Sequence, residues 1–189
     1  MAERKVPNIL ITGTPGTGKT TTAEKVAEAL AGFTHVNVGD LVKTKSLHAG
    51  KHEDEEFDSK VVLFQWLGLR WHSFHTGRRF DCDELEDQMS QGGNVVDFHT
   101  CDFFPERWFD LVVVLRTDND ILYPRLEKRG YSTKKIQENV ECEIMCVVAE
   151  EARESYKEEI IWMLQSNSIP DLEANVARIT HQVKQWTGM

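Results

Sequence analysis

The chain contains 189 residues, of which 40% are hydrophobic and 28% are charged, and its formal net charge is −9. This length suits one α/β domain with a single sizeable core, and the balanced composition excludes a largely disordered chain or a collagen-like fibre. The excess of acidic residues disfavours a broad surface for nucleic acid. We therefore expect no direct sequence-specific nucleic acid binding, although a local basic pocket for phosphate groups is compatible with this charge.

Membrane insertion and secretion are also disfavoured. The longest apolar run, residues 61–69, is interrupted by Gln65 and Gly68 and is far too short to span a bilayer. The first residues lack the apolar stretch and the cleavage site of a signal peptide. The four cysteines show no spacing typical of a disulfide framework. We therefore expect a soluble intracellular protein with reduced thiols and no membrane partner.

Short apolar runs alternate with helical patterns along the chain. In chain order, the patterns predict a strand at residues 8–11, a helix at 19–31, strands at 35–38, 94–97 and 111–115, helical spacing over 136–148, a strand at 160–164 and a closing amphipathic helix over 172–186. No linker or repeat divides the chain. One domain over residues 1–189 is predicted, with a parallel sheet covered by helices on both faces.

The most specific chemical signal follows the first predicted strand. Residues 13–20 read Gly-Thr-Pro-Gly-Thr-Gly-Lys-Thr and fit the phosphate-binding pattern G-x-x-x-x-G-K-[ST], with a strand before and a helix after. Three glycines, Gly13, Gly16 and Gly18, permit backbone angles that turn successive N–H groups toward phosphate oxygens. We expect Lys19 to reach the β- and γ-phosphates of ATP and the Thr20 hydroxyl to bind Mg²⁺.

Two other interpretations of this loop are weaker. A glycine-rich turn could fit the pattern by chance, but the strand, the loop and the helix all agree with a nucleotide site. A dinucleotide site is disfavoured because the glycines follow the order G-x-x-G-x-G, the reverse of the Rossmann pattern.

A P-loop needs a second acid to hold the hydrated Mg²⁺ ion, usually at the end of a neighbouring strand. Asp97 closes the predicted strand at residues 94–97 and is our candidate, with an exposed strand-end carboxylate as the alternative. His99 lies two residues later and would project to the same side if the strand continued. It is a candidate to orient water or phosphate, and the alternative is a loop histidine with a structural hydrogen bond.

Arg125 and Arg129 lie four residues apart on a predicted helix, and therefore on one face of it. Phosphoryl transfer spreads negative charge over equatorial oxygens, and an arginine aimed at them lowers the barrier; we favour Arg129 over Arg125 for this role. A solvated basic helix end is the alternative. Pro124 predicts that the helix starts or kinks at that position.

Further motifs carry a resemblance to a known family. They are Asn-Val-Gly-Asp-Leu at 37–41, Val-Asp-Phe-His at 96–99, Cys-Asp-Phe-Phe-Pro-Glu-Arg-Trp at 101–108, Arg-Gly-Tyr at 129–131 and Glu-Ser-Tyr-Lys-Glu-Glu-Ile at 154–160. Together with the P-loop they resemble the adenylate kinase isoenzyme 6 family, a nuclear, coilin-interacting kinase and ATPase group, over residues 7–58 and 82–186. The Phe-Phe-Pro-Glu-Arg-Trp and Asp-Phe-His motifs are far more diagnostic than a P-loop alone.

The resemblance implies a P-loop nucleoside monophosphate kinase fold, an α/β fold with a central five-stranded parallel sheet and helices on both faces. ATP would be bound by Gly13, Gly16, Gly18, Lys19, Thr20, Thr21 and Arg129, Mg²⁺ by Thr20 and Asp97, and AMP by a region at about 37–82 that includes Asp40 and Lys43. Asp97 and His99 occupy the family's Walker B and catalytic histidine positions. Arg129 would lie at the start of a short lid segment at about 128–138.

Two functions follow from this resemblance. The first is an adenylate kinase that transfers a phosphoryl group from Mg-ATP to AMP, with associated ATP hydrolysis. The second is an assembly factor with little AMP kinase activity, in which slow ATP hydrolysis drives contact with a protein of the small ribosomal subunit during its maturation. The resemblance also implies a nuclear as well as cytoplasmic location, and we expect a monomer. A small-molecule kinase of the shikimate type is a third alternative, disfavoured by the motifs.

One segment departs from the family pattern. Residues 59–80 replace a short acidic stretch with a longer one rich in aromatic and apolar side chains, inside the region expected to hold AMP. Three interpretations stay open: an insertion that packs as a helix and remodels the acceptor site, an exposed apolar patch that recruits a partner, or foreign sequence such as a retained intron or alternative splice product. We favour the last, because family matching resumes abruptly at residue 83.

Overall fold

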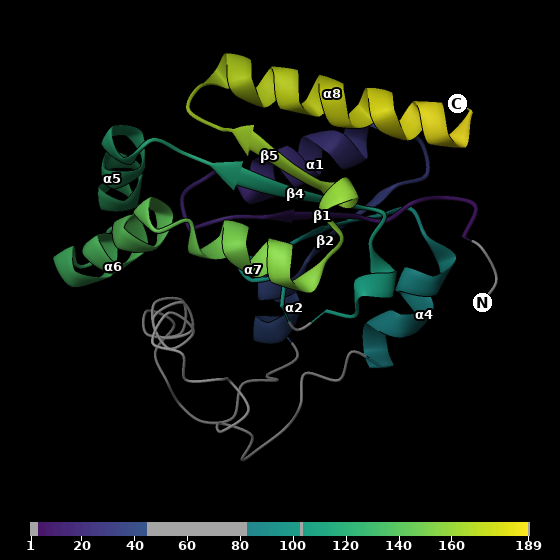
Figure 1. Cartoon of the computed structure of the whole chain (residues 1–189), viewed down its shortest axis with the longest axis horizontal. Coiled ribbons are helices and arrows are strands. Elements are labelled where there is room, and N and C mark those ends of the chain that lie inside the picture. Colours follow the sequence, from purple (N-terminus) through teal and green to yellow (C-terminus); the bar gives the residue numbers. More distant parts are fainter. Residues whose placement is uncertain (1–3, 45–82, 103, 189) are drawn as a thin grey trace.

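A parallel sheet forms the centre of the computed structural model, which describes residues 4–44, 83–102 and 104–188. The strands are β1 (Ile9–Thr12), β2 (Thr34–Asn37), β3 (Asn94–Asp97), β4 (Leu111–Arg116) and β5 (Ile161–Gln165). They lie in the order β2-β3-β1-β4-β5, and all neighbours are parallel (Figure 1). The predicted α/β fold is confirmed, and each strand lies within one residue of its predicted bounds.

Helices cover both faces of this sheet (Figure 1). They are α1 (Lys19–Ala29), α2 (Val38–Thr44), α4 (Asp83–Gln91), α5 (Asn119–Lys128), α6 (Thr133–Ile144), α7 (Val147–Ser155) and α8 (Ile169–Thr187), with 3₁₀ turns at Glu106–Trp108 and Glu158–Ile160. α1 and α8 pack on one face, and α4, α7 and the segment after β3 pack on the other. The central strand β1 is buried at every position, as its apolar sequence predicts.

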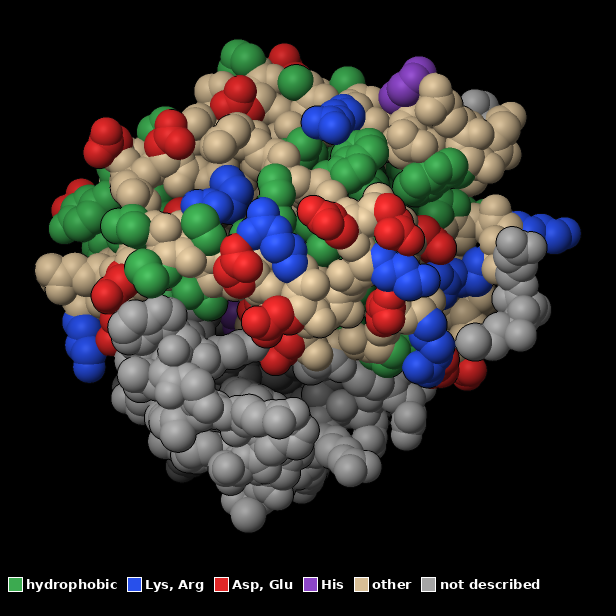
Figure 2. Space-filling view, in the orientation of Figure 1, with side chains coloured by type: hydrophobic (Ala, Val, Ile, Leu, Met, Phe, Trp, Pro, Cys, Tyr) green, Lys and Arg blue, Asp and Glu red, His purple; other side chains and the backbone are tan. Residues whose placement is uncertain are grey.

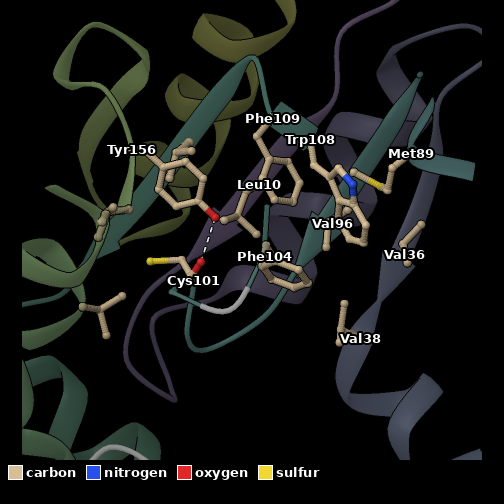
Figure 3. Packing of buried hydrophobic residues seen from close by; sticks show 14 of the residues in the cluster. Leu10, Val36, Val38, Met89, Val96, Cys101, Phe104, Trp108, Phe109 and Tyr156 are labelled. Atoms are coloured by element: carbon tan, nitrogen blue, oxygen red, sulfur yellow. Dashed lines mark hydrogen bonds between the residues drawn. The ribbon is translucent and has the colours of Figure 1, made fainter. Parts of the chain in front are cut away.

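Aromatic side chains fill the core on the α7 side of the sheet (Figure 3). Phe104 packs edge-on against Phe109, with ring centroids 5.5 Å apart, and Phe109 packs against Tyr156 at 6.2 Å. The Tyr156 hydroxyl donates a 2.7 Å hydrogen bond to the carbonyl oxygen of Cys101. Part of the family-diagnostic run at 101–108 therefore builds the core next to the site.

The helical spacing over residues 136–148 is divided between two helices. α6 and α7 are separated at Met145 and Cys146, and Cys146 adopts a left-handed conformation with φ of 58°. Arg116 at the end of β4 donates hydrogen bonds to Glu143 before the break and to the Cys146 sulfur after it. These contacts between distant segments accompany the break between the two helices. No glycine or proline marks its position in the sequence.

Pro124 lies inside α5. The helix begins at Asn119, so the predicted start at Pro124 is wrong. Leu122 and Leu126 on either side of the proline are fully buried. Their burial offsets the cost of a proline in a helix interior, which is about 3 kcal/mol.

Charged side chains of both signs are interspersed over the face shown in Figure 2. Among the described residues on this face, no broad field of one sign is seen. This face therefore lacks the continuous basic surface that attracts a phosphate backbone. Within the described ranges, no helix is both long and apolar enough to cross a membrane.

Candidate active site

The phosphate-binding loop joins the carboxyl end of β1 to the start of α1. Its glycines, Gly13, Gly16 and Gly18, all have positive φ angles, of 146°, 97° and 89°. A Cβ atom at Gly13 would lie 2.6 Å from the carbonyl oxygen of Leu115 in β4, so only glycine fits there. The loop thus has the backbone conformation that the motif predicts.

The Lys19 side chain lies back over this loop. Its Nζ atom donates a 3.2 Å hydrogen bond to the carbonyl oxygen of Thr14, which also accepts from the hydroxyl of Thr17 at 2.9 Å. Thr20 and Thr21 follow in the first turn of α1 and are exposed. The structure therefore gathers these predicted ATP-binding residues at a helix N-terminus, where the helix dipole favours an anion.

The Asp97 side chain contacts the first turn of α1 and the neighbouring strand β2. One carboxylate oxygen accepts a 2.7 Å hydrogen bond from the Thr20 hydroxyl, and the other lies 2.6 Å from His35 Nε2. Asp97 is 4% exposed and lies in register with Ile11 of β1 and Asn37 of β2. The two residues predicted to hold Mg²⁺ are therefore in direct contact, and His35, which the sequence did not single out, orients one of them.

His99 lies just beyond β3 and is 9% exposed. Phe98 extends the pairing by one residue, because its N–H donates to the carbonyl oxygen of Ile11 at 3.2 Å. The rings of Phe98 and His99 contact each other with centroids 4.3 Å apart. Since β3 ends at Asp97, the same-side projection expected of a continuing strand does not apply, and His99 belongs to the loop after β3.

Glu151 of α7 anchors the loop that carries His99. One of its carboxylate oxygens accepts hydrogen bonds from the backbone N–H groups of Cys101, at 2.6 Å, and Asp102, at 3.0 Å. Burial, and after it the charge of the nearby Asp102, raises the pKa of Glu151 to about 7. Glu151 is therefore a second residue that sequence reasoning missed, because an acid within an acidic helix looks solvated until the helix is packed.

Glu151→Gln should change how stability depends on pH. The pKa of Glu151 is higher in the folded chain than its ordinary value of 4.5, so the folded state binds more protons, and the stability that this group contributes is lost as pH rises from about 5 to about 8. Glutamine keeps an oxygen for the two N–H groups and removes this titration. The free energy of unfolding of the variant relative to wild type should therefore rise by about 2 kcal/mol across this range.

Urea unfolding at both ends of that pH range measures this difference. Glu150→Gln, at the exposed neighbouring position on α7, is the matched control and should follow the wild-type pH profile. A Glu151→Gln profile parallel to that of the wild type would show that the buried carboxyl group does not titrate between these pH values.

The two arginines of α5 have different surroundings. Arg125 donates 2.8 Å hydrogen bonds to the carbonyl oxygens of Ser166 and Asn167 and reaches that of Gly16 at 3.4 Å. It therefore clamps the loop after β5 to the phosphate loop. Arg129 is the C-cap residue of α5 and lines the cavity beside this clamp. Arg125 lines the same cavity, so the preference for Arg129 as the nucleotide-facing arginine stays a prediction.

A cavity of about 470 Å³ lies beside the phosphate loop. It is lined by Gly16, Gly18, Thr21, Arg125, Lys128, Arg129, Ser166, Ser168, Ile169 and Leu172. Ile169 is 71% exposed and, with Leu172, adds apolar surface to the basic lining. Sequence reasoning missed these α8 residues because no motif marks them; the only available signal is their position just after the carboxyl end of a parallel strand.

Of the predicted AMP-binding region at about 37–82, the structure describes residues 37–44. The backbone N–H of Asp40 donates a 2.8 Å hydrogen bond to the side-chain oxygen of Asn37, and the Asp40 side chain is exposed. Lys43 lies in α2, and its side chain is outside the described residues. Residues 45–82, which include the atypical segment at 59–80, are also outside them.

A P-loop at the carboxyl end of the central strand, with the Thr20 hydroxyl against an acid on the adjacent strand, is the arrangement of a P-loop nucleotide-binding protein, a class that includes the P-loop kinases. Solved structures agree with this fold. A shikimate kinase from Acinetobacter baumannii superposes with a TM-score of 0.60 at 15% identity, over 95% of this chain and 94% of that one. The chain belongs to the adenylate kinase isoenzyme 6 family, which confirms the predicted resemblance, and the protein is therefore an enzyme of the kinase class.

Two relatives illustrate how completely the family match spans the chain. The adenylate kinase isoenzyme 6 homolog of Dictyostelium discoideum is 47% identical over 97% of this chain and 95% of its own length. The homolog of Caenorhabditis elegans is 48% identical over 93% of this chain and 88% of its own length. Residues 9–146 also match a family described as an AAA domain. The shikimate kinase likeness shows the fold alone and gives no support to a shikimate-type acceptor.

Proposed function

We propose that the protein transfers the γ-phosphoryl group of ATP, bound with Mg²⁺, to AMP and so forms two molecules of ADP. The observation that carries this proposal is the 2.7 Å contact between the Thr20 hydroxyl and Asp97 beside the P-loop, in a chain of the adenylate kinase isoenzyme 6 family. A hydroxyl and a carboxylate oxygen are the hard ligands that Mg²⁺ prefers, so the donor set fits this ion. When bound, Mg²⁺ neutralises charge that develops on the β- and γ-phosphates.

Residues of the chain would bind the phosphates and orient the attacking group. The N–H groups of the P-loop and the Lys19 ammonium would hold the β- and γ-phosphates, with Lys19 exchanging its bond to Thr14 for phosphate oxygens. Arg129 would reach the phosphates from the lining of the cavity, whose volume and partly apolar lining suit the adenosine group. His99, held in the loop that Glu151 anchors, would orient the attacking group.

We further propose ATP hydrolysis coupled to maturation of the small ribosomal subunit, through a ribosomal protein and with a nuclear as well as cytoplasmic location. This proposal rests on family membership, and the net charge of −9 supports it because ribosomal proteins that bind RNA are basic. It uses the same Lys19, Thr20 and Asp97 and differs from the kinase proposal only in the acceptor.

ADP formation by the purified chain with Mg-ATP, with and without AMP, tests the proposal. Lys19→Ala serves as the blank, and Lys25→Ala, at an exposed lysine on the same helix, is the matched control. Strong stimulation by AMP, with two ADP formed per ATP consumed, supports an adenylate kinase. Hydrolysis that is indifferent to AMP would overturn AMP transfer and favour the assembly factor. An absence of turnover while ATP still binds would contradict both.

A further inference from the structure

Glu143 of α6 is a buried acid that the proposed mechanism does not use. It is 3% exposed, and both of its carboxylate oxygens are engaged. One accepts a 2.5 Å hydrogen bond from the hydroxyl of Thr14 in the phosphate loop. The other accepts from Arg116 Nε at 2.6 Å and from the backbone N–H of Thr117 at 3.0 Å. A single side chain thus joins α6 to the phosphate loop and to the end of β4.

Thr14 is the residue through which this contact reaches the backbone of the phosphate loop. It is 1% exposed, and its carbonyl oxygen accepts hydrogen bonds from Lys19 Nζ and from the backbone N–H and hydroxyl of Thr17. Fixing the Thr14 side chain therefore also fixes this turn of the phosphate loop, whose N–H groups would hold the phosphates. Glu143 acts on the phosphate loop through Thr14.

The other end of the contact belongs to the α5–α6 pair. The predicted lid at 128–138 comprises the end of α5, the connection between the two helices and the first turns of α6. α5 and α6 pack through Leu122, Leu126 and Ile136, and they lie side by side in Figure 1. A Cβ atom at Gly16 would meet Leu122 at 2.8 Å, so α5 also touches the phosphate loop closely. Arg129 at the end of α5 and Glu143 on α6 are therefore parts of one packed unit.

We infer that Glu143 is a positioning residue that couples the α5–α6 pair, and with it Arg129, to the phosphate loop through Thr14. This inference rests on the proposed function, because it concerns groups that act on the ATP phosphates. The coupling holds the phosphate loop and Arg129 at a fixed separation, which matters most when charge develops on the transferred group. Its loss therefore lowers kcat more than it weakens ATP binding.

Thr14→Val removes the hydroxyl and keeps the volume of the side chain. We expect kcat to fall by about 10-fold or more, with the KM for ATP changed by less than about 3-fold. Thr14→Ser restores the hydroxyl and should recover most of the wild-type kcat. Glu141→Gln, at an exposed acid on the same helix, is the matched control and should behave as wild type.

Glu143→Gln completes a double-mutant cycle with Thr14→Val. If the two side chains act as one unit, the double variant loses little more kcat than the worse single variant. The inference would be overturned if the effects of the two substitutions on kcat multiplied in the double variant. It would also be overturned if the kcat of Thr14→Ser were no higher than that of Thr14→Val. Urea unfolding of each variant at the assay temperature measures the fraction of protein that is folded. A loss of folded protein that accounts for the whole loss of kcat would also overturn the inference.

Each variant is assayed for ADP formation with AMP and for ATP hydrolysis without it. A wild type that hydrolyses ATP but ignores AMP contradicts the proposed AMP transfer. The same cycle, measured on hydrolysis alone, then still decides whether Thr14 and Glu143 are coupled, so failure of the function and failure of this inference give different results.

Discussion

Lys19→Ala is expected to lower ATP turnover by about 100-fold or more while leaving the fold intact. The Lys19 ammonium lies over the phosphate loop, 3.2 Å from the carbonyl oxygen of Thr14. Charge-assisted bonds from this group to phosphate oxygens strengthen as charge develops in phosphoryl transfer, so their loss appears mainly in kcat. The fold should survive because the Thr14 carbonyl oxygen keeps its hydrogen bonds from Thr17.

Initial rates of ADP formation under saturating Mg-ATP measure this effect, and far-UV circular dichroism with urea unfolding checks the fold. Lys25→Ala removes a charge of the same sign from the same helix, at an exposed position away from the loop. It should keep the wild-type rate. If Lys19→Ala and Lys25→Ala had equal rates, the phosphate-binding loop would not be the site of turnover.

Two parts of the site could be predicted from the sequence: the backbone conformation of the P-loop and the contact between Thr20 and Asp97. The P-loop could be read from spacing because its glycine positions and its lysine lie within one turn between a strand and a helix. The contact between Thr20 and Asp97 could be anticipated because parallel strands bring their carboxyl ends to one edge of a sheet.

The roles and residues that the sequence could not distinguish depend on contacts between distant segments. Arg125 and Arg129 share a helix face, and what separates their roles is that Arg125 binds backbone carbonyl oxygens after β5, which have no sequence signature. Glu143 and Glu151 resemble solvated helical acids until α6 and α7 are packed against the sheet. The break between α6 and α7 at Cys146 has the same origin, since a non-glycine residue takes the left-handed conformation there.

Only the structure shows which residues of the family motifs lie at the candidate site and which lie in the core. Asp97 and His99, from the Asp-Phe-His motif, lie at the carboxyl edge of the sheet. Phe104 and Trp108, from the equally diagnostic Phe-Phe-Pro-Glu-Arg-Trp motif, are buried in the core on the α7 side. A motif identifies a family whether its residues act on substrate or only hold the loop beside it. Phe104 and Trp108 belong to the second kind, because they pack in the same core cluster as Cys101, whose N–H group Glu151 binds.

Asp97→Asn should also lower Mg-ATP turnover by about 100-fold or more, through loss of the metal rather than loss of the fold. Asparagine keeps one oxygen that can accept from the Thr20 hydroxyl, so the local packing at this 4% exposed position is retained. It removes the negative charge that attracts the cation. The Mg²⁺ concentration for half-maximal turnover should therefore rise by about 10-fold or more, while binding of metal-free ATP is unchanged or tighter, because repulsion between the carboxylate and the phosphates is gone.

A Mg²⁺ titration of turnover, paired with ATP binding measured in the presence of a chelator, separates these two effects. Asp87→Asn removes a carboxylate from an exposed position of α4 and should leave both curves at their wild-type positions. A fall in metal-free ATP binding equal to the fall in turnover would mean that Asp97 supports the loop through Thr20 and His35 and does not act through the cation. Because Asp97 contacts both of these residues, only the difference between the two titrations distinguishes a metal-binding acid from a structural one.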